Sequence, residues 1–179
     1  MHRRDVLRVL GVAAIPPLIG LDPESLYALA GTIHGRGSSR APRALSAQQA
    51  ALVGQVADLI LPRTDSPAAT DVGVPAFIDL LLDEWYSPEQ RARLLRGIDA
   101  IDRLARAEGA SFGSLSAEKR AEIATRLDSA ADRPPGSAKS AFRELKGLAI
   151  YGYFTSERVM EDVLHYPIVP GRYGACEHV

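Results

Sequence analysis

The sequence predicts an all-α protein, an irregular bundle of about five or six helices with an ordered coil as its C-terminal tail. Apolar residues recur at helical spacing in five separate segments, and a serine stands at the start of most of them. No segment alternates cleanly between apolar and polar residues, so strands are not expected. A chain of 179 residues is long enough for one domain and too short for two full ones.

The first expected helix begins at Ser46, which forms a capping box with Gln49. Pro62 ends this helix, because proline removes a backbone donor and cannot continue it. The apolar stripe of the helix consists of Leu52, Val53, Val56, Leu59 and Ile60. A turn-rich loop follows over residues 63–73. The second helix is expected over residues 75–86, and because it is apolar on most sides it should lie in the core.

The third helix is expected to begin at Ser87 and Pro88, since a serine cap followed by proline in the first turn is typical of a helix start. Gly109 ends it. Its inward-facing residues are Leu94, Leu95, Ile98, Ile101, Leu104 and Ala105. The fourth helix is expected to follow Ser116 and to cover residues 117–130.

A fifth helix is expected after the helix-breaking residues 133–136. It covers residues 137–153, and Phe142, Leu145, Leu148 and Ala149 align on one face. A short helical piece is expected near residues 156–164. Residues 165–179 contain two prolines and two glycines, so we expect ordered coil there rather than helix.

The charge of the chain is nearly balanced, with 21 lysines and arginines against 22 acidic residues. This balance argues against a nucleic-acid-binding protein, whose affinity comes largely from neutralising phosphates. The distribution is uneven, however. The first 45 residues hold six arginines against three acidic residues, whereas the rest of the chain holds 15 basic against 19 acidic residues. This change of sign indicates an N-terminal segment with a separate role.

The N-terminal segment is interpreted as an export signal, with a cytoplasmic amphipathic helix or an uncleaved anchor as the alternative. Two adjacent arginines precede an uncharged run at residues 9–21, which contains two prolines and is too short to span a membrane. The segment resembles a twin-arginine signal with a small-residue cleavage pattern, carried by Arg3, Arg4, Leu7, Ala28 and Ala30. The chain is therefore divided into a signal peptide (1–30), a flexible linker (31–45) and a helical domain (46–179).

The sequence lacks the common motifs of cofactor binding and catalysis. No dinucleotide-binding glycine motif, nucleophile elbow or P-loop occurs. One cysteine and four scattered histidines do not suffice for a zinc or iron–sulfur site. Asp79, Asp83 and Glu84 could share a helix face for acid–base chemistry, but a solvated polar face explains them more simply. We therefore expect no catalytic, cofactor-binding or metal-binding residues in this chain.

Cys176 is the single cysteine of a chain that is expected to be exported. An odd cysteine in such a protein indicates either an intermolecular disulfide or a free thiol, and the sequence leaves both open. Glu177 and His178 follow it directly. Three adjacent residues cannot complete a tetrahedral metal site by themselves, so a metal is not expected there.

Aromatic residues gather in two places, although they make up only 6% of the chain. Trp85 and Tyr86 form the first group, and the second consists of Tyr151, Tyr153, Phe154, Tyr166 and Tyr173. Tyrosine and tryptophan are enriched at protein interfaces because they combine a large apolar area with a hydrogen-bonding group. We therefore predict that these residues bind a partner. Tyr151 and Tyr153 point to different faces of a helix, so at least one of them is expected in the core.

Several separated blocks of the sequence carry a family resemblance. They are residues 57–67 (ADLILPRTDSP), residues 71–79 (DVGVPAFID), Phe142-x-x-Leu145-Lys146, residues 151–157 (YGYFTSE) and Tyr166-x-Pro-x-x-Pro-Gly-x-Tyr173. In this order they resemble the gluconate 2-dehydrogenase subunit 3 family. The resemblance spans about residues 45–176 and is more specific to the family than to any substrate.

The resemblance implies a non-catalytic small subunit of a periplasmic FAD-dependent dehydrogenase that oxidises sugars, sugar acids or polyols. FAD would be carried by a large subunit of the glucose–methanol–choline oxidoreductase type, and a cytochrome c subunit with haem c often takes the electrons. The small subunit would supply the signal for the twin-arginine translocase and support the maturation and stability of the large subunit.

Two other functions are weighed against this one. The first is a stand-alone periplasmic enzyme, a hydrolase or lyase acting on oxidised sugars, which would need a pocket where groups such as Asp79, Glu84 or His165 converge. The second is a free-standing binding module. Turnover by the small chain alone would favour the former, and binding without any flavoprotein would favour the latter.

Overall fold

The computed structural model describes residues 42–129 and 134–165. Five α-helices occupy this part of the chain: α4 (Ala47–Ile60), α5 (Val74–Glu84), α6 (Pro88–Ala107), α7 (Ala117–Asp128) and α8 (Ala138–Phe154). Three short helical turns accompany them: η1 (Thr70–Val72), η2 (Phe112–Ser114) and η3 (Val159–Val163). The described residues contain no strand. The predicted all-α bundle is confirmed.

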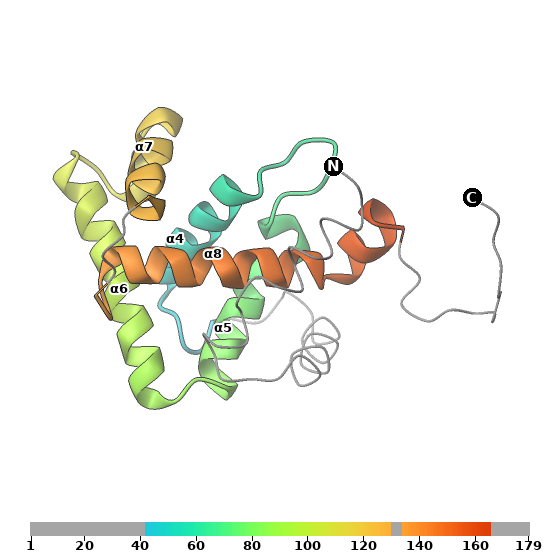
Figure 1. The fold of residues 1–179 in the computed structure, drawn as a ribbon, viewed down its shortest axis with the longest axis horizontal. Coiled ribbons are helices and arrows are strands. Elements are labelled where there is room, and N and C mark those ends of the chain that lie inside the picture. Colours follow the sequence, from blue (N-terminus) through green and yellow to red (C-terminus); the bar gives the residue numbers. More distant parts are fainter. Residues whose placement is uncertain (1–41, 130–133, 166–179) are drawn as a thin grey trace.

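Helix α8 lies at the centre of the arrangement. It contacts α4, α5, α6 and α7, and Figure 1 shows it running across the molecule with the other helices placed around it. Its buried apolar side chains are those of Ala138, Ala141, Phe142, Leu145, Leu148, Ala149 and Tyr153. Full burial of one large apolar side chain contributes about 1.5–3 kcal/mol. Because α8 contacts each of the other four described α-helices, the bundle packs around it.

Four of the five helices begin at the serines that the sequence indicates. At each start the serine hydroxyl accepts a hydrogen bond from the backbone N–H three residues later, and the pairs are Ser46–Gln49, Ser87–Gln90, Ser116–Lys119 and Ser137–Ser140. At the first two pairs the glutamine side chain bonds back to the serine N–H and completes a capping box. These caps satisfy donors that a helix start otherwise leaves unpaired.

Helix α5 begins differently, at Gly73 between η1 and α5. Gly73 has a φ of 78°, a left-handed conformation that a residue with a side chain adopts only with strain. Pro75 lies in the first turn, as predicted. The helix ends at Glu84, two residues earlier than expected, because the Tyr86 N–H donates to the Leu81 carbonyl, five residues back, instead of continuing the four-residue pattern.

The core follows the predicted helix faces. In α5, Phe77, Ile78, Leu81 and Leu82 are completely buried, which confirms that this helix lies in the core. In α6 the inward face consists of Leu94, Ile98, Ile101 and Ala105, whereas Leu95 and Leu104 are only partly buried. Apolar periodicity thus identified the buried faces, and the partly buried residues lie at their margins.

The short turns account for most of the differences between prediction and structure. The sequence pattern did not indicate η1 and η2, and both are single turns; η2 places Phe112 in the core. The helical piece expected near residues 156–164 is present, and it includes a π-type turn in which the Leu164 N–H donates to the Val159 carbonyl at 2.9 Å. Within the described ranges, no helix is both long and apolar enough to cross a membrane.

Candidate functional site

A polar loop, residues 61–73, connects α4 to α5 and is fixed by two carboxylates. Asp58 accepts hydrogen bonds from the N–H and the hydroxyl of Thr70, both at 2.8 Å. Asp71 accepts the Ala68 N–H at 2.7 Å and also pairs with Arg63. Side chains of this kind replace the helical bonds that the loop lacks. The loop therefore has a defined conformation and is not merely a spacer.

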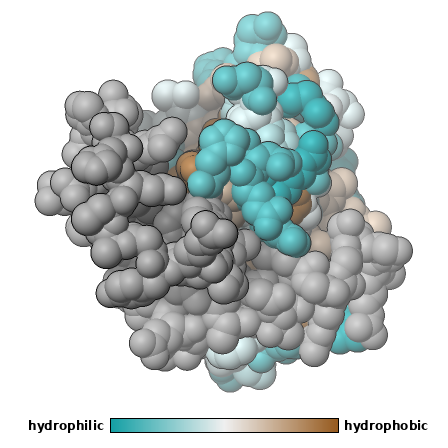
Figure 2. Space-filling view, turned by 90° about the vertical axis from the view of Figure 1, so that its right-hand side faces the viewer, coloured by the Kyte–Doolittle hydropathy of each residue, from teal (hydrophilic) through white to brown (hydrophobic). Residues whose placement is uncertain are grey.

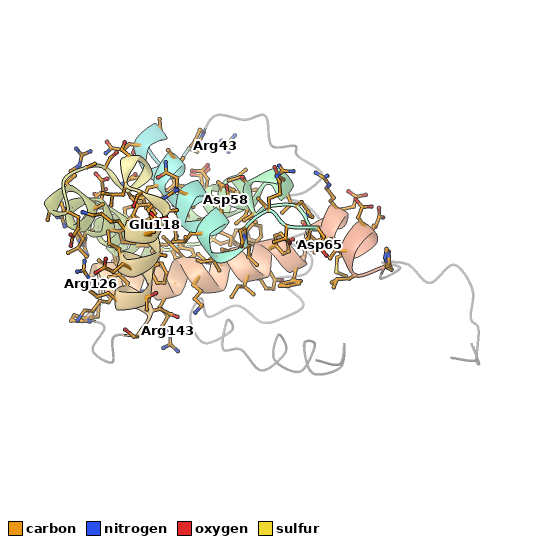
Figure 3. All side chains as sticks on the ribbon, turned by 90° about the horizontal axis from the view of Figure 1, so that it is seen from above. Arg43, Asp58, Asp65, Glu118, Arg126 and Arg143 are labelled. Atoms are coloured by element: carbon orange, nitrogen blue, oxygen red, sulfur yellow. The ribbon has the colours of Figure 1, made fainter. Side chains whose placement is uncertain are left out.

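The loop contacts the C-terminal end of α8. The Tyr153 hydroxyl donates to the Pro67 carbonyl at 2.8 Å, and the Tyr153 ring lies edge-on to Phe154 with ring centroids 5.2 Å apart. Figure 3 labels Asp58 on α4 and Asp65 in the loop that follows it. Figure 2 views the molecule from this side, and its described part is mostly hydrophilic with small hydrophobic areas.

Tyr86, one of the residues predicted to bind a partner, is buried in the core of the described domain. Its hydroxyl donates to Glu144 Oε1 at 2.9 Å, and both residues are buried. Burial raises the pKa of both groups, while the charge of nearby Arg93 acts in the opposite direction. The pair ties the turn between α5 and α6 to α8. Tyr153 is buried in the same way, as was expected for at least one tyrosine of α8.

Trp85, the neighbour of Tyr86, has the opposite placement. Its side chain is 39% exposed, and among the described residues only Val163 is a comparably exposed large hydrophobic residue. Tyr151 and Phe154 are half-buried, and Tyr151 also packs against Phe77 with ring centroids 5.9 Å apart. The structure therefore leaves three of the predicted partner-binding residues accessible: Trp85, Tyr151 and Phe154. The predictions for Arg3, Arg4, Leu7, Ala28, Ala30, Tyr166, Tyr173 and Cys176 fall outside the described residues.

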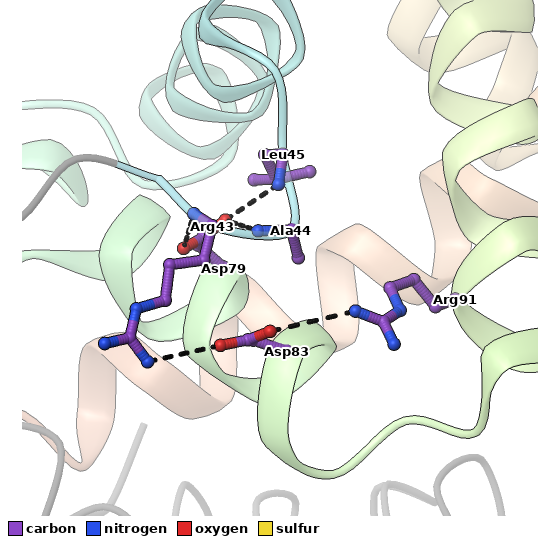
Figure 4. A network of polar contacts seen from close by, with 6 residues as sticks. All are labelled: Arg43, Ala44, Leu45, Asp79, Asp83 and Arg91. Carbon is purple, nitrogen blue, oxygen red and sulfur yellow. Dashed lines mark hydrogen bonds and ion pairs between the residues drawn. The ribbon is translucent and has the colours of Figure 1, made fainter.

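Asp79 has a structural role that the sequence pattern did not indicate. It is only 8% exposed, and its carboxylate accepts the backbone N–H groups of Arg43 at 2.8 Å, Ala44 at 3.0 Å and Leu45 at 2.8 Å (Figure 4). The interpretation of this residue as part of a solvated face is therefore wrong. A single carboxylate within an otherwise apolar helix segment was the available signal, because a buried charge must find partners.

Asp83 lies one turn after Asp79 and makes contacts of a different kind. Its two oxygens pair with Arg43 at 3.4 Å and Arg91 at 3.8 Å (Figure 4). Because these contacts are partly exposed to water, they contribute little to stability. Residues 43–45, which the composition assigned to the flexible linker, make specific bonds to α5 and thus belong to the folded domain.

The residues suggested for a stand-alone enzyme are engaged at different places in the fold. Both Asp79 oxygens bind the backbone of residues 43–45, Glu84 is exposed at the end of α5, and His165 follows η3 with its Nδ1 atom 3.1 Å from the Glu161 carbonyl oxygen. Within residues 42–129 and 134–165, no group of three or more histidine, cysteine or acidic side chains is arranged to hold a metal ion. The pocket that this alternative requires is not formed by these three residues.

A cleft of about 320 Å³ lies between the start of α4 and the C-terminal half of α6. Its polar side chains pair across it: Gln48 donates to Asp102 at 3.0 Å and Gln49 donates to Asp99 at 2.8 Å. Asp102 also accepts a bond from Arg106 at 2.7 Å. The carboxylates of the cleft are thus used to brace two helices against each other.

Fold and contacts together define a small helical protein whose buried acidic groups hold its own backbone and side chains in place. Among its described aromatic residues, Trp85 is exposed and Tyr151 and Phe154 are half-buried. The chain belongs to the gluconate 2-dehydrogenase subunit 3 family, whose model matches residues 47–171. No curated protein and no solved structure matches the chain. The family resemblance inferred from the sequence blocks is therefore confirmed.

Proposed function

We propose that this chain is an accessory small subunit of a dehydrogenase complex, without catalytic residues of its own. The observation that carries the proposal is the family match over residues 47–171. The contacts of the described domain support it, because Asp58, Asp71, Asp79 and Glu144 all bond to other parts of the same chain. Groups used in this way hold a fold together.

The partner in this proposal is a large FAD-dependent subunit that oxidises a sugar, a sugar acid or a polyol. A cytochrome c subunit is the proposed electron acceptor in complexes that contain one. This chain would bind the large subunit through Trp85, Tyr151 and Phe154, the aromatic residues that the fold leaves accessible. Amphipathic aromatic side chains are frequent energetic centres of protein interfaces. The small subunit would thereby stabilise the large subunit and support its maturation.

The proposed location is the periplasm, and the proposed route is twin-arginine export. Arg3 and Arg4 precede the short apolar run and are the basis of this assignment. An export route that carries folded proteins suits a small subunit that delivers a partner already loaded with its cofactor.

Co-expression tests the proposal directly. When the full chain is co-expressed with the proposed large FAD-dependent subunit, it is expected to form a stable complex, and dehydrogenase activity is expected in the periplasm. Without the small chain, the large subunit should lose most of its exported activity. An unchanged activity and location of the large subunit in the absence of this chain would overturn the accessory role.

The export role is tested by the double substitution Arg3→Lys and Arg4→Lys. We expect both subunits to remain in the cytoplasm, still bound to each other, since the folded domain is unaltered. Cell fractionation and immunoblotting of both subunits give the measurement. Substitution of Arg8 by lysine is the matched control and should leave export intact. Continued export of the large subunit with the doubly substituted chain would contradict the carrier role.

A further inference from the structure

Residues 43–45 form a short segment, here called the strap, that lies against the middle of α5. Three consecutive backbone N–H groups of the strap point at one carboxylate, that of Asp79 (Figure 4). Oδ2 accepts the bond from Arg43, and Oδ1 accepts those from Ala44 and Leu45. Hydrogen bonds to an ionised acceptor are about twice as strong as neutral ones. Asp79 therefore fixes the strap backbone at three successive positions.

The hydrogen bonds between the strap and Asp79 can form only after the domain has folded. Its donors and Asp79 are separated by 34 to 36 residues in the chain, so no local turn brings them together. The Leu45 side chain is 4% exposed and belongs to the same apolar core as α4 and α5. Because Asp79 reaches the strap only when α5 is packed against α4, these hydrogen bonds require the tertiary contact between the two helices.

The ion pairs beside the strap are secondary to these bonds. Asp83 lies between Arg43 and Arg91, at 3.4 Å and 3.8 Å, and both arginine side chains are about one third exposed. Pairs of this kind are screened by water and salt and contribute little. Loss of Asp83 should therefore loosen the Arg43 side chain without releasing the strap backbone.

We propose that Asp79 locks the strap onto the folded domain, so that folding shields the Arg43–Ala44 peptide bond and fixes the point at which the preceding segment leaves the domain. The strap is a conformational device of this chain alone. It depends neither on a partner nor on the export route, so an experiment can contradict it without contradicting the proposed function.

Trypsin provides a probe of the lock, because it cleaves after arginine and the chain has Arg40 and Arg43 on either side of the strap boundary. The full chain is digested under native conditions, and the new N-termini at Ala41 and Ala44 are followed by mass spectrometry. In the wild-type protein the Ala41 terminus should accumulate, while cleavage between Arg43 and Ala44 is slow. The substitution Asp79→Asn should accelerate cleavage at Arg43 by about tenfold or more, since it removes the charge and replaces one acceptor with a donor.

Two matched controls distinguish the lock from a general loosening of the domain. Asp58→Asn removes a carboxylate that fixes the loop, and Asp83→Asn removes the neighbouring ion pairs; both should keep the Arg43–Ala44 bond slow to cleave. Circular dichroism of the Asp79→Asn protein should still show the folded helices. Equal cleavage at Arg40 and Arg43 in the wild-type protein would overturn the proposal.

Hydrogen exchange tests the lock without any substitution. In the wild-type full chain, the amides of Arg43, Ala44 and Leu45 should exchange as slowly as interior amides of α5, because they open only when Asp79 is released. Exchange of these three amides at the rate of an unfolded chain would overturn the proposal, whatever the stability of the substituted proteins.

Discussion

Two buried carboxylates, Asp79 and Glu144, attach parts of the chain that helix packing alone would leave loose. Asp79 holds the backbone before α4, and Glu144 holds the turn between α5 and α6 through Tyr86. Their environments differ. Asp79 accepts three backbone N–H groups, whereas Glu144 has a single tyrosine donor and an environment that raises its pKa by burial. A substitution that prevents Glu144 from ionising should therefore have a measurable effect on the stability of the domain.

The substitution Glu144→Gln should change how stability depends on pH. A carboxyl whose pKa is raised in the folded state releases its proton first in the unfolded state, so wild-type stability falls as pH rises from about 4.5 toward the raised pKa. Within this interval the loss is at most about 1.4 kcal/mol per pH unit. Glutamine does not titrate, so urea unfolding over a range of pH should show the variant gaining stability relative to the wild type as pH rises.

Glu122→Gln is the control for this experiment, because Glu122 is exposed on α7. Its unfolding free energy should follow the wild-type pH profile. If the Glu144→Gln and wild-type profiles run parallel from acid to neutral pH, burial of Glu144 does not influence its ionisation and the argument fails.

At the scale of elements, the contact between α6 and α8 requires a residue without a side chain at Gly97. A Cβ atom added at Gly97 would lie 2.5 Å from the Ala141 Cβ and 2.9 Å from the Ser137 carbonyl oxygen. The second of these atoms belongs to the backbone at the start of α8 and cannot move independently. Gly97 thus allows the two helices to approach, and this contact joins α6 to the central helix.

Gly97→Ala should destabilise the protein by about 1–3 kcal/mol, because the strain of separating two packed helices exceeds the gain in helix propensity. Thermal unfolding measures the loss. The matched control is Gly147→Ala on α8, where an added Cβ meets no atom within 4 Å. That substitution should be neutral or stabilise by up to about 1 kcal/mol. Equal effects of the two alanines would show that the α6–α8 crossing tolerates a side chain.

The helices could be predicted from the sequence because their signals are local. Serine caps, the proline in the first turn of α5 and the apolar periodicity each act within a few residues. The single turns η1 and η2 were missed because they are too short to show a period. Contacts between distant residues were also inaccessible: the role of Asp79 depends on residues more than thirty positions away, and no local pattern reports that pairing.

At the scale of the whole molecule, the adjacent residues Trp85 and Tyr86 lie in opposite environments. Tyr86 is buried against Glu144, while Trp85 is exposed and is part of the proposed interface. The sequence could identify the pair as unusual, but it could not tell which ring is buried, because α5 ends at Glu84 and the turn sends the rings to different environments. The same holds for Tyr153 and Phe154 at the end of α8.

Trp85→Ala should weaken the complex with the large subunit while leaving the isolated domain stable. If Trp85 is an energetic centre of the interface, affinity should fall by about tenfold or more. Tyr86→Phe should leave binding unchanged but lower the stability of the domain by about 1–3 kcal/mol, because Glu144 loses its donor. Co-purification and thermal unfolding of both variants provide the comparison. Undiminished binding by Trp85→Ala would remove Trp85 from the proposed interface.

The central position of α8 also has a consequence for the order in which this chain is made. A ribosome synthesises α4, α5, α6 and α7 before α8, yet each of them packs against α8. The bond from Tyr153 to Pro67 spans 86 residues. During translation the apolar faces of the earlier helices therefore stay uncovered until α8 has been synthesised. A nascent chain is prone to aggregate during this period. Chaperones that recognise exposed apolar segments would bind this chain before residue 154 leaves the ribosome.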